Sequence, residues 1–186
     1  MSLTKVLRVG IIVDVKTILY GVNMKLLIAS DIHGDIESAR ILVEAFEREG
    51  CDKMLLLGDI LYHGPRNDLP GRYAPKEVIA LLNVYKEKIL AVRGNCDTEV
   101  DQMVLEFPIL ADYALLALDG LSVYATHGHN YNTKTPPPMA EGDILLHGHT
   151  HVIRAEKVGN NNTYIILHSE KANLLLLIWM AKVFLQ

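Results

Sequence analysis

The chain has 186 residues, of which 50% are hydrophobic and 22% are charged, and its formal net charge is −4. The length suits a single domain with a sizeable core, and the composition is that of a globular protein, which excludes a disordered chain. The acidic balance, without a stripe of lysine and arginine, argues against binding to a nucleic-acid duplex.

No export signal is recognisable in the first 23 residues. They begin with positive charge, but Arg8, Asp14 and Lys16 interrupt the apolar run that a signal peptide needs. The two cysteines, Cys51 and Cys96, provide no disulfide framework and suit a reducing compartment. We therefore expect a cytoplasmic protein.

Alternating strands and helices are predicted in the first half of the chain. Three apolar runs have the pattern of buried strands that end in polar loops: 24–29, 54–57 and 89–92. A helix is expected from the N-cap Asp35 to Gly50, because apolar residues recur there at helical spacing. A second helix is expected over about 76–86, with Pro75 near its first turn, and a short helical stretch is expected after Asp97, ending near Phe107-Pro108.

The second half is predicted to be mostly strand. Residues 113–118 and 121–126 flank Asp119-Gly120, a dipeptide typical of a two-residue hairpin turn. Further strands are expected at 143–146, 152–158 and 163–167. The change from alternating elements to strands predicts mixed sheets covered by helices.

The C-terminal segment is strongly apolar. The run NLLLLIWMAKVFL, at 173–185, is shorter than the roughly 20 residues that a membrane span needs. We expect a packed terminal helix or strand there and no membrane partner.

Potential metal ligands follow the predicted strands. In the segment GDILLHGHTH, at 142–151, three histidines come directly after an apolar strand. Because residues two apart share a face of an extended chain, His149 and His151 can converge on one object. A polar turn with solvated histidines explains this segment equally well by itself. Four other strand ends, however, carry the same residue types, namely Asp31, His33, Asp59, Asn95, Asp97, His127 and His129.

This pattern favours a metal centre at one edge of the sheets. The carboxyl ends of strands in an α/β sheet line one edge, where ligands bind. Each residue has an ordinary explanation by itself, such as a helix cap, a turn or a core histidine, but five strand ends together do not. Oxygen and nitrogen donors without thiolates suit Mn, Fe, Zn or a similar divalent ion. The number of donors fits two ions roughly 3.5–4 Å apart, an arrangement used in phosphoryl transfer.

Five ordered motifs resemble those of the calcineurin-like metallophosphoesterases. They are DIHG (31–34), GDILYHG (58–64), RGNCD (93–97), THGH (126–129) and HGHTH (147–151). The run HGPRN (63–67) is similar to the small bacterial branch of that family, the YfcE-type phosphodiesterases. The resemblance extends from about Met24 to about Val158.

The resemblance implies a fold, a metal site and a reaction. The implied fold is α/β, a four-layer α-β-β-α sandwich of two mixed sheets. One ion is implied at Asp31, His33, Asp59 and His151, and a second at Asp59, Asn95, His127 and His149, with Asp59 as the bridge. The expected cofactors are two divalent metal ions, most of all Mn²⁺, with Fe, Zn, Ni or Co as alternatives. The implied reaction is hydrolysis of small phosphodiesters by a metal-activated hydroxide.

Further candidate catalytic residues lie in loops beside the implied ligands. Many family members carry a histidine after the asparagine, where this chain has Cys96, so a general acid for the leaving group is missing. The YfcE-type branch resembles this chain in having cysteine there. His63, Arg66 and His129 are candidates for contacting the phosphate or supporting ligands, although solvated loop residues would look the same. The expected catalytic residues are these three and Cys96, together with the implied metal ligands Asp59 and Asn95.

Both ends of the chain differ from the family pattern. Family chains begin near Met24, so residues 1–23 are expected to be an N-terminal extension outside the core. The metallophosphoesterase domain is expected over 24–168. Residues 169–186 are expected to be a divergent apolar tail in place of a loop and closing strands.

Two alternatives to a phosphodiesterase stay open from the sequence. A phosphomonoesterase could use the same metal site, and a non-catalytic binding scaffold could have the same fold. The complete ligand set argues against a scaffold, whereas the altered tail leaves it open. The expected partner is a small phosphodiester, and the sequence is also compatible with a homo-oligomer.

Overall fold

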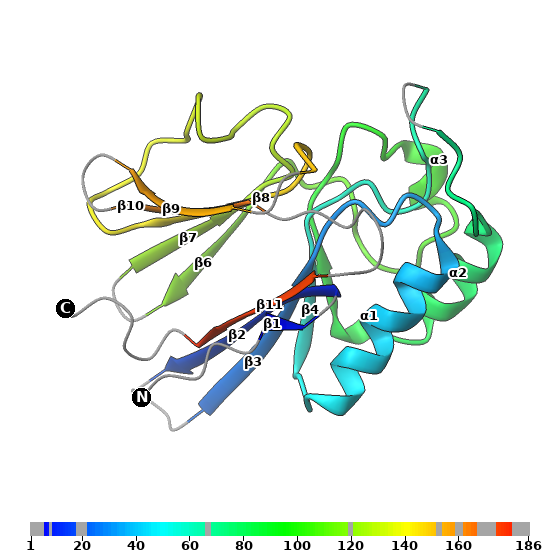
Figure 1. The fold of residues 1–186 in the computed structure, drawn as a ribbon, viewed down its shortest axis with the longest axis horizontal. Helices are drawn as coiled ribbons and strands as arrows, with labels where there is room; N and C mark the ends of the chain where they lie inside the picture. Colours follow the sequence, from blue (N-terminus) through cyan, green and yellow to red (C-terminus); the bar gives the residue numbers. More distant parts are fainter. Residues whose placement is uncertain are drawn as a thin grey trace.

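The structure is a computed structural model with two sheets packed face to face (Figure 1). It describes residues 6–7, 9–17, 22–65, 68–118, 121–151, 154–158, 162–166 and 174–179. The first sheet has the order β1 (Val6–Leu7), β11 (Leu174–Trp179), β2 (Val9–Thr17), β3 (Val22–Ala29), β4 (Lys53–Leu56) and β5 (Ile89–Ala91). The second has the order β6 (Ala114–Leu118), β7 (Leu121–Ala125), β8 (Ile144–His147), β10 (Asn162–Ile166) and β9 (Arg154–Val158).

Both sheets are mixed, as the sequence predicts. β3, β4 and β5 are parallel, and β2 joins β3 in antiparallel register. β7, β8 and β10 are parallel, whereas the predicted hairpin pairs β6 with β7. Ala29 is opposite Leu56, and Leu56 is opposite Ala91, so three parallel strands end level with one another. Their polar loops therefore leave the sheet side by side.

The helices form where the capping residues predict them. α1 (Ile36–Arg48) begins after Asp35, whose Oδ1 accepts the Ser38 N–H at 2.8 Å. α2 (Pro75–Asn83) has proline in its first turn and ends earlier than predicted, because a 3₁₀ turn, η1 (Lys86–Lys88), follows. α3 (Glu99–Gln102) is a single turn with a capping box between Thr98 and Asp101. Within the described residues, no helix is long and apolar enough to cross a bilayer.

The core has two layers, one on each face of the six-stranded sheet. Along β3 the side chains alternate, so Leu27 packs against the helices while Leu26 and Ile28 pack against the other sheet. The layer under the helices also includes Leu42, Met54, Leu56, Val78 and Phe107. The layer between the sheets also includes Leu55, Leu57, Val92, Val123, Ile144 and Leu146. Apolar packing on both faces fixes the strand ends from which the polar loops start.

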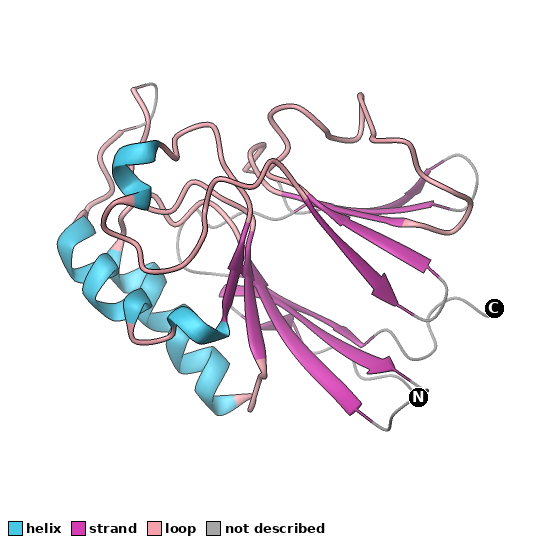
Figure 2. Ribbon diagram, turned by 180° about the vertical axis from the view of Figure 1, so that it is seen from behind, coloured by secondary structure: helices cyan, strands magenta, loops and turns pink. Residues whose placement is uncertain are grey.

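The predicted α/β fold of two mixed sheets with helices is confirmed, and its layers differ in one respect. The helices of the described residues lie against the six-stranded sheet (Figure 2). The connection between β7 and β8 runs over the outer face of the five-stranded sheet instead (Figure 1). Leu145 alternates with Ile144 and Leu146 and is fully buried on that face. Three consecutive prolines, 136–138, are incompatible with the interior of a helix at that part of the connection.

The domain boundary predicted at Met24 can be tested by truncation. β2 pairs with β3, but the hydrophobic clusters found among the described side chains begin at Leu26. We expect deletion of residues 1–23 to leave a folded domain, with the circular dichroism spectrum and gel-filtration behaviour of the full chain. Aggregation or loss of cooperative unfolding would show instead that the edge of β3 needs β2 and that the boundary is misplaced.

Candidate metal centre

The loops at the strand ends hold the predicted ligands in an uncommon backbone conformation. Within the described chain, the non-glycine residues with positive φ are Asp31 (58°), His33 (49°), Asp59 (55°), His149 (67°) and His151 (56°). All five are predicted metal ligands. The left-handed region is uncommon for side-chain-bearing residues and costs about 1–3 kcal/mol each, so it persists only where the surroundings impose it. Such strain is concentrated at functional sites.

Backbone hydrogen bonds tie these loops to one another. The N–H groups of Asp31, His33 and Gly34 donate to the carbonyls of Gly58, Asp59 and Ile60, at 2.9–3.0 Å. In the other sheet, the Gly148 N–H donates to the His127 carbonyl at 2.8 Å. The His149 N–H then donates to Oδ2 of Asp31 at 3.1 Å, which joins the loops of the two sheets.

Two glycines allow the loops to approach this closely. A Cβ on Gly94 would lie 2.0 Å from Oδ1 of Asp59, and one on Gly148 would lie 1.9 Å from Oγ of Ser30 and 2.5 Å from Oδ2 of Asp31. Any side chain at either position would displace a buried carboxylate. The glycines of the GNCD and HGHTH motifs are therefore part of the site.

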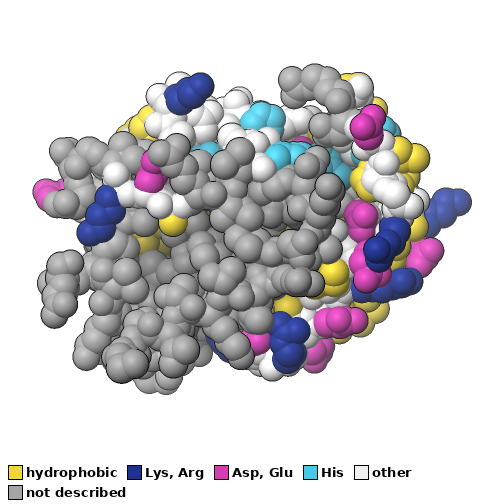
Figure 3. All heavy atoms as spheres, viewed as in Figure 1, with side chains coloured by type: hydrophobic (Ala, Val, Ile, Leu, Met, Phe, Trp, Pro, Cys, Tyr) yellow, Lys and Arg dark blue, Asp and Glu magenta, His cyan; other side chains and the backbone are white. Residues whose placement is uncertain are grey.

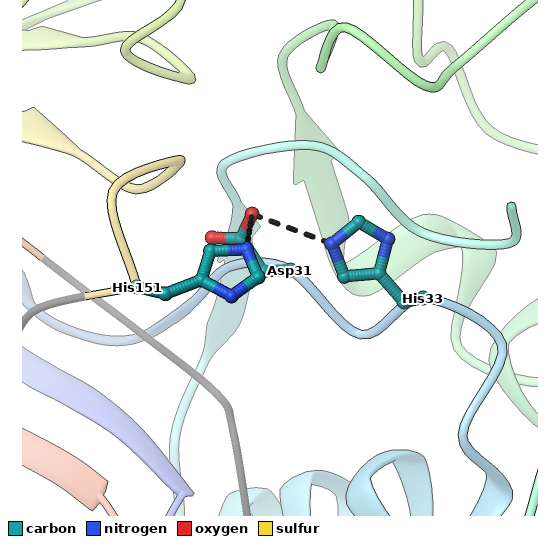
Figure 4. A group of neighbouring side chains, drawn as sticks. All are labelled: Asp31, His33 and His151. Carbon is teal, nitrogen blue, oxygen red and sulfur yellow. Dashed lines mark ion pairs between the residues drawn. The ribbon is translucent and has the colours of Figure 1, made fainter. Parts of the chain in front are cut away.

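The first group of ligands is Asp31, His33 and His151 (Figure 4). Oδ1 of Asp31 lies 3.7 Å from Nε2 of His33 and 3.5 Å from Nε2 of His151, so the carboxylate sits between the two rings. Nδ1 of His33 donates to the Tyr62 carbonyl at 2.7 Å, which leaves Nε2 as the lone-pair nitrogen. That Nε2 is buried without a hydrogen-bond partner. A cation is the partner that these atoms fit.

The second group surrounds His127. Its Nε2 lies 3.3 Å from Oδ2 of Asp59, 3.0 Å from Oδ1 of Asn95 and 3.2 Å from Nδ1 of His149. Its Nδ1 donates to the Leu57 carbonyl at 2.8 Å, so Nε2 again faces the carboxylate. Oδ2 of Asp59 is also 3.7 Å from Nε2 of His33. Asp59 therefore lies between the two groups, and the structure brings all seven predicted ligands together.

The buried carboxylates of the site favour a positive charge on the imidazoles beside them, as they would favour a bound cation. Burial acts to raise the pKa of Asp31 and of Asp59, but the neighbouring imidazoles, His151 and His33 beside Asp31 and His127 beside Asp59, lower both pKa values below the ordinary one. Burial conversely acts to lower the pKa of His33 and of His127, and the two carboxylates raise both. Histidinium and carboxylate stabilise each other, as a divalent cation and these carboxylates would.

The donor atoms fit a pair of divalent ions. Three sets have ligand atoms within 4.8 Å of one another: Asp31, His33 and His151; Asp31, Asp59 and His127; and His33, Asp59 and Cys96. The first two sets share Asp31 and contain only oxygen and nitrogen donors, which are typical of Mn, Fe or Zn sites. Figure 3 shows histidine side chains gathered at the edge of the molecule where the loops of the two sheets meet.

The histidines of the HGHTH motif converge by a different geometry from the one predicted. His147 is the last residue of β8, and the chain bends directly after it. His149 and His151 are therefore directed by left-handed turns and not by strand alternation. His147 is fully buried, and its Nδ1 donates to the Gly148 carbonyl at 3.0 Å.

The other candidate catalytic residues lie at different distances from the ligands. Cys96 is buried, and its Sγ lies 3.1 Å from Nδ2 of Asn95. The ring of His129 is half-buried, with its centroid 5.4 Å from that of His127. His63 packs against the rings of Tyr62 and Tyr73, and none of the three ligand sets includes it. Arg66 lies outside the described residues.

Sequence reasoning assigned no role to Asp97, although it noted the residue at a strand end. The Asp97 carboxylate is buried and accepts the backbone N–H groups of Asp59, Ile60 and Gly94 at 2.7–2.9 Å. The only signal in the sequence is its place two residues after Asn95, because partners in the backbone leave no side-chain pattern.

Two proteins named phosphodiesterases have sequences similar to this chain. The relative named Phosphodiesterase YfcE, from Escherichia coli strain K12, is 46% identical over 136 residues, which are 73% of this chain and 74% of that protein. Phosphodiesterase MJ0936, from Methanocaldococcus jannaschii, is 26% identical over 136 residues, which are 69% of this chain and 74% of that protein.

A solved structure supports the same relationship. The Escherichia coli phosphoesterase Yfce superposes with a TM-score of 0.74 at 43% identity, covering 77% of this chain and 78% of that one. The family model of the calcineurin-like phosphoesterase superfamily domain matches residues 24–168, which contain every predicted ligand. The chain therefore belongs to the calcineurin-like phosphoesterase superfamily.

Proposed function

We propose that the protein is a metal-dependent phosphodiesterase that hydrolyses small phosphodiesters. The observation that carries the proposal is the position of Asp59, whose Oδ2 lies 3.7 Å from Nε2 of His33 and 3.3 Å from Nε2 of His127. One carboxylate between two sets of imidazoles is what a pair of bridged ions needs. The two relatives named phosphodiesterases support the choice of a diester substrate.

We assign seven residues to the two ions. Asp31, His33, Asp59 and His151 would hold the first ion, and Asp59, Asn95, His127 and His149 the second. When bound, the ions would lower the pKa of a coordinated water towards neutrality and neutralise the phosphoryl oxygens. We further propose Mn²⁺ as the preferred ion, because the donors are mostly oxygen and imidazole nitrogen. A reducing, cytoplasmic location would suit the two free cysteines.

The surrounding residues orient these ligands. The carbonyls of Tyr62 and Leu57 fix the protonated nitrogens of His33 and His127, so that each imidazole presents Nε2 to the carboxylates. The Cys96 thiol lies beside the amide nitrogen of Asn95, which turns the amide oxygen towards His127. His129, whose ring centroid lies 5.4 Å from that of His127, is our candidate for contacting a phosphoryl oxygen at the second ion. His63 and Arg66 stay candidates for the substrate side.

Cys96 is poorly suited to donate a proton to the leaving group. Burial, followed by the charge of Asp59, raises the pKa of the Cys96 thiol to about 12. A thiol with so high a pKa is a poor proton donor at neutral pH, since the most effective general acids have a pKa near the working pH. The site therefore suits leaving groups that depart without a proton.

Replacing the shared carboxylate should remove both ions. We expect Asp59→Ala to lose both bound metals and all turnover of an aryl diester, because its removal leaves two coordination shells incomplete. His33→Ala should mainly weaken the first ion. Asp52→Ala is the matched control, since Asp52 lies before β4, away from the proposed ligands, and its Oδ2 accepts the Lys25 backbone N–H at 2.7 Å. Metal content by elemental analysis, measured beside turnover, checks this; two retained ions in Asp59→Ala would refute the assignment.

The same preparation distinguishes the alternative activities. A phosphodiesterase should hydrolyse bis(para-nitrophenyl) phosphate faster than para-nitrophenyl phosphate at equal concentration. The reverse order would indicate a phosphomonoesterase. Full metal occupancy without turnover of either compound would indicate a binding scaffold.

Metal affinity should fall as the pH falls. The pKa values of His33 and His127 are raised in the metal-free protein, and the imidazoles must lose these protons to bind a metal. Protons therefore compete below the raised pKa values, and the apparent Kd for Mn²⁺ should increase by about tenfold per pH unit for each proton displaced. Calorimetric titration with Mn²⁺ between about pH 6 and 8, in buffers of different ionisation enthalpy, measures both effects. A Kd independent of pH would contradict the assignment of these histidines.

The leaving group should decide how much a proton donor helps. Diesters with aryl leaving groups should react readily, and alkyl diesters should react slowly. Cys96→His introduces an imidazole that can donate the proton, and general acid catalysis is worth ~10²- to 10⁴-fold where protonation limits the rate. We expect a larger gain for alkyl than for aryl diesters, with metal content checked in parallel. Equal changes for both classes, with both ions retained, would show that position 96 does not control protonation.

A further inference from the structure

We infer that Asp97 is a positioning residue that sets the geometry of the metal site through the backbone of the Asp59 and Asn95 loops. The inference rests on the metal-binding role proposed above for Asp59 and Asn95. The hydrogen bonds described for the Asp97 side chain are all accepted from backbone N–H groups, and none involves an atom that we assign to a metal. Its effect on the metals is therefore indirect.

The Asp97 carboxylate lies between two loops that follow neighbouring strands. It is 1% exposed, and its Oδ2 accepts the N–H of Asp59 at 2.8 Å and that of Gly94 at 2.7 Å. Its Oδ1 accepts the N–H of Ile60 at 2.9 Å. Two of these donors follow β4 and one follows β5, so a single side chain joins the ends of both strands.

These hydrogen bonds hold Asp59 from both sides. Asp59 has a φ of 55°, and its N–H donates to Asp97 while its Oδ1 accepts the Cys96 N–H at 2.8 Å. The loops are also in direct contact, because a Cβ on Gly58 would lie 2.3 Å from the backbone nitrogen of Gly94. Without an acceptor between them, three buried N–H groups would converge with no partner, and the loops would have to move apart.

The same peptide groups pass this constraint to the loop of the first strand. The carbonyls of Gly58, Asp59 and Ile60 accept the N–H groups of the 31–34 loop, while two of the three residues donate to Asp97. The backbone of Asp59 and Ile60 thus connects Asp97 on one side with Asp31 and His33 on the other. Ligands of both proposed ions depend on one buried carboxylate.

Only a carboxylate satisfies this arrangement. An asparagine has the same shape but offers one oxygen, and its NH₂ group would face at least one of the three backbone donors in either orientation. Asp97→Asn therefore places two donors against each other with almost no change in volume. We expect the variant to fold with loosened loops, which separates this effect from the cavity that an alanine would leave.

Asp143 provides a matched control in the same chain. It is 4% exposed and also bridges backbone groups, since Oδ1 accepts the Ser122 N–H at 2.9 Å and Oδ2 accepts the Ala140 N–H at 2.8 Å. Asp143 comes before β8, whereas the loop that carries the proposed ligands His149 and His151 comes after β8. Asp143→Asn should therefore disturb a comparable buried carboxylate away from the metal site.

Amide hydrogen exchange of the metal-free protein tests the link between the loops. Asp97→Asn should speed exchange at least tenfold at residues 59, 60 and 94 and in the 31–34 loop, and Asp143→Asn only near residues 122 and 140. Parental exchange at residues 59 and 60 in Asp97→Asn would overturn the inference. Because neither metal nor substrate is present, this result is independent of the proposed phosphodiesterase activity.

Titration with Mn²⁺ alone then tests the consequence for the site. Outer partners of metal ligands typically change metal affinity by 10- to 100-fold, and we expect a weakening of ~10- to 100-fold in Asp97→Asn. The electron paramagnetic resonance signal of a spin-coupled Mn²⁺ pair should be lost in Asp97→Asn and kept in Asp143→Asn. Equal weakening in both variants would show general destabilisation and overturn the positioning role, as would a parental affinity and coupled signal in Asp97→Asn.

Discussion

Two buried carboxylates, Asp31 and Asp59, are the constraint on which the rest of the site depends. Each is at most 3% exposed, and burying two like charges is costly unless cations lie beside them. The protein supplies imidazoles on several sides, within 3.3–3.9 Å of the carboxylate oxygens. The histidines of the motifs thus offset the buried negative charge of the two carboxylates. The same positions also allow their ring nitrogens to coordinate a metal.

Strained loops of this kind need a rigid support, which the two-layer core provides. β3 and β4 are buried on both faces, so the points where their loops begin cannot shift without loss of apolar packing. Backbone hydrogen bonds then impose the left-handed conformations of Asp31, His33 and Asp59. Gly94 and Gly148 permit contacts that any side chain would block. The packing of the sheets thereby offsets the conformational free energy that the strained residues of the site cost.

Most of the strands, and the side chains that converge at their ends, are predictable from the sequence because both leave local patterns. Apolar runs of four to eight residues mark buried strands, and the polar residues after them mark one edge of the sheets. The cover over the five-stranded sheet was less predictable, since it depends on how a proline-containing connection packs and not on periodicity. The left-handed conformations of His149 and His151 were also not predictable, because the spacing of residues does not distinguish a left-handed turn from an extended chain.

Asp97 shows why positioning residues are harder to predict than ligands. A metal ligand belongs to a set of side chains whose chemistry is visible in the sequence, whereas the partners of Asp97 are backbone groups that every residue has. Its carboxylate also differs physically from those of Asp31 and Asp59. Asp97 is stabilised by converging N–H dipoles, while Asp31 and Asp59 face imidazoles that can exchange protons for cations. The three neighbouring carboxylates therefore perform two different tasks, and the partners that each one faces decide which task it performs.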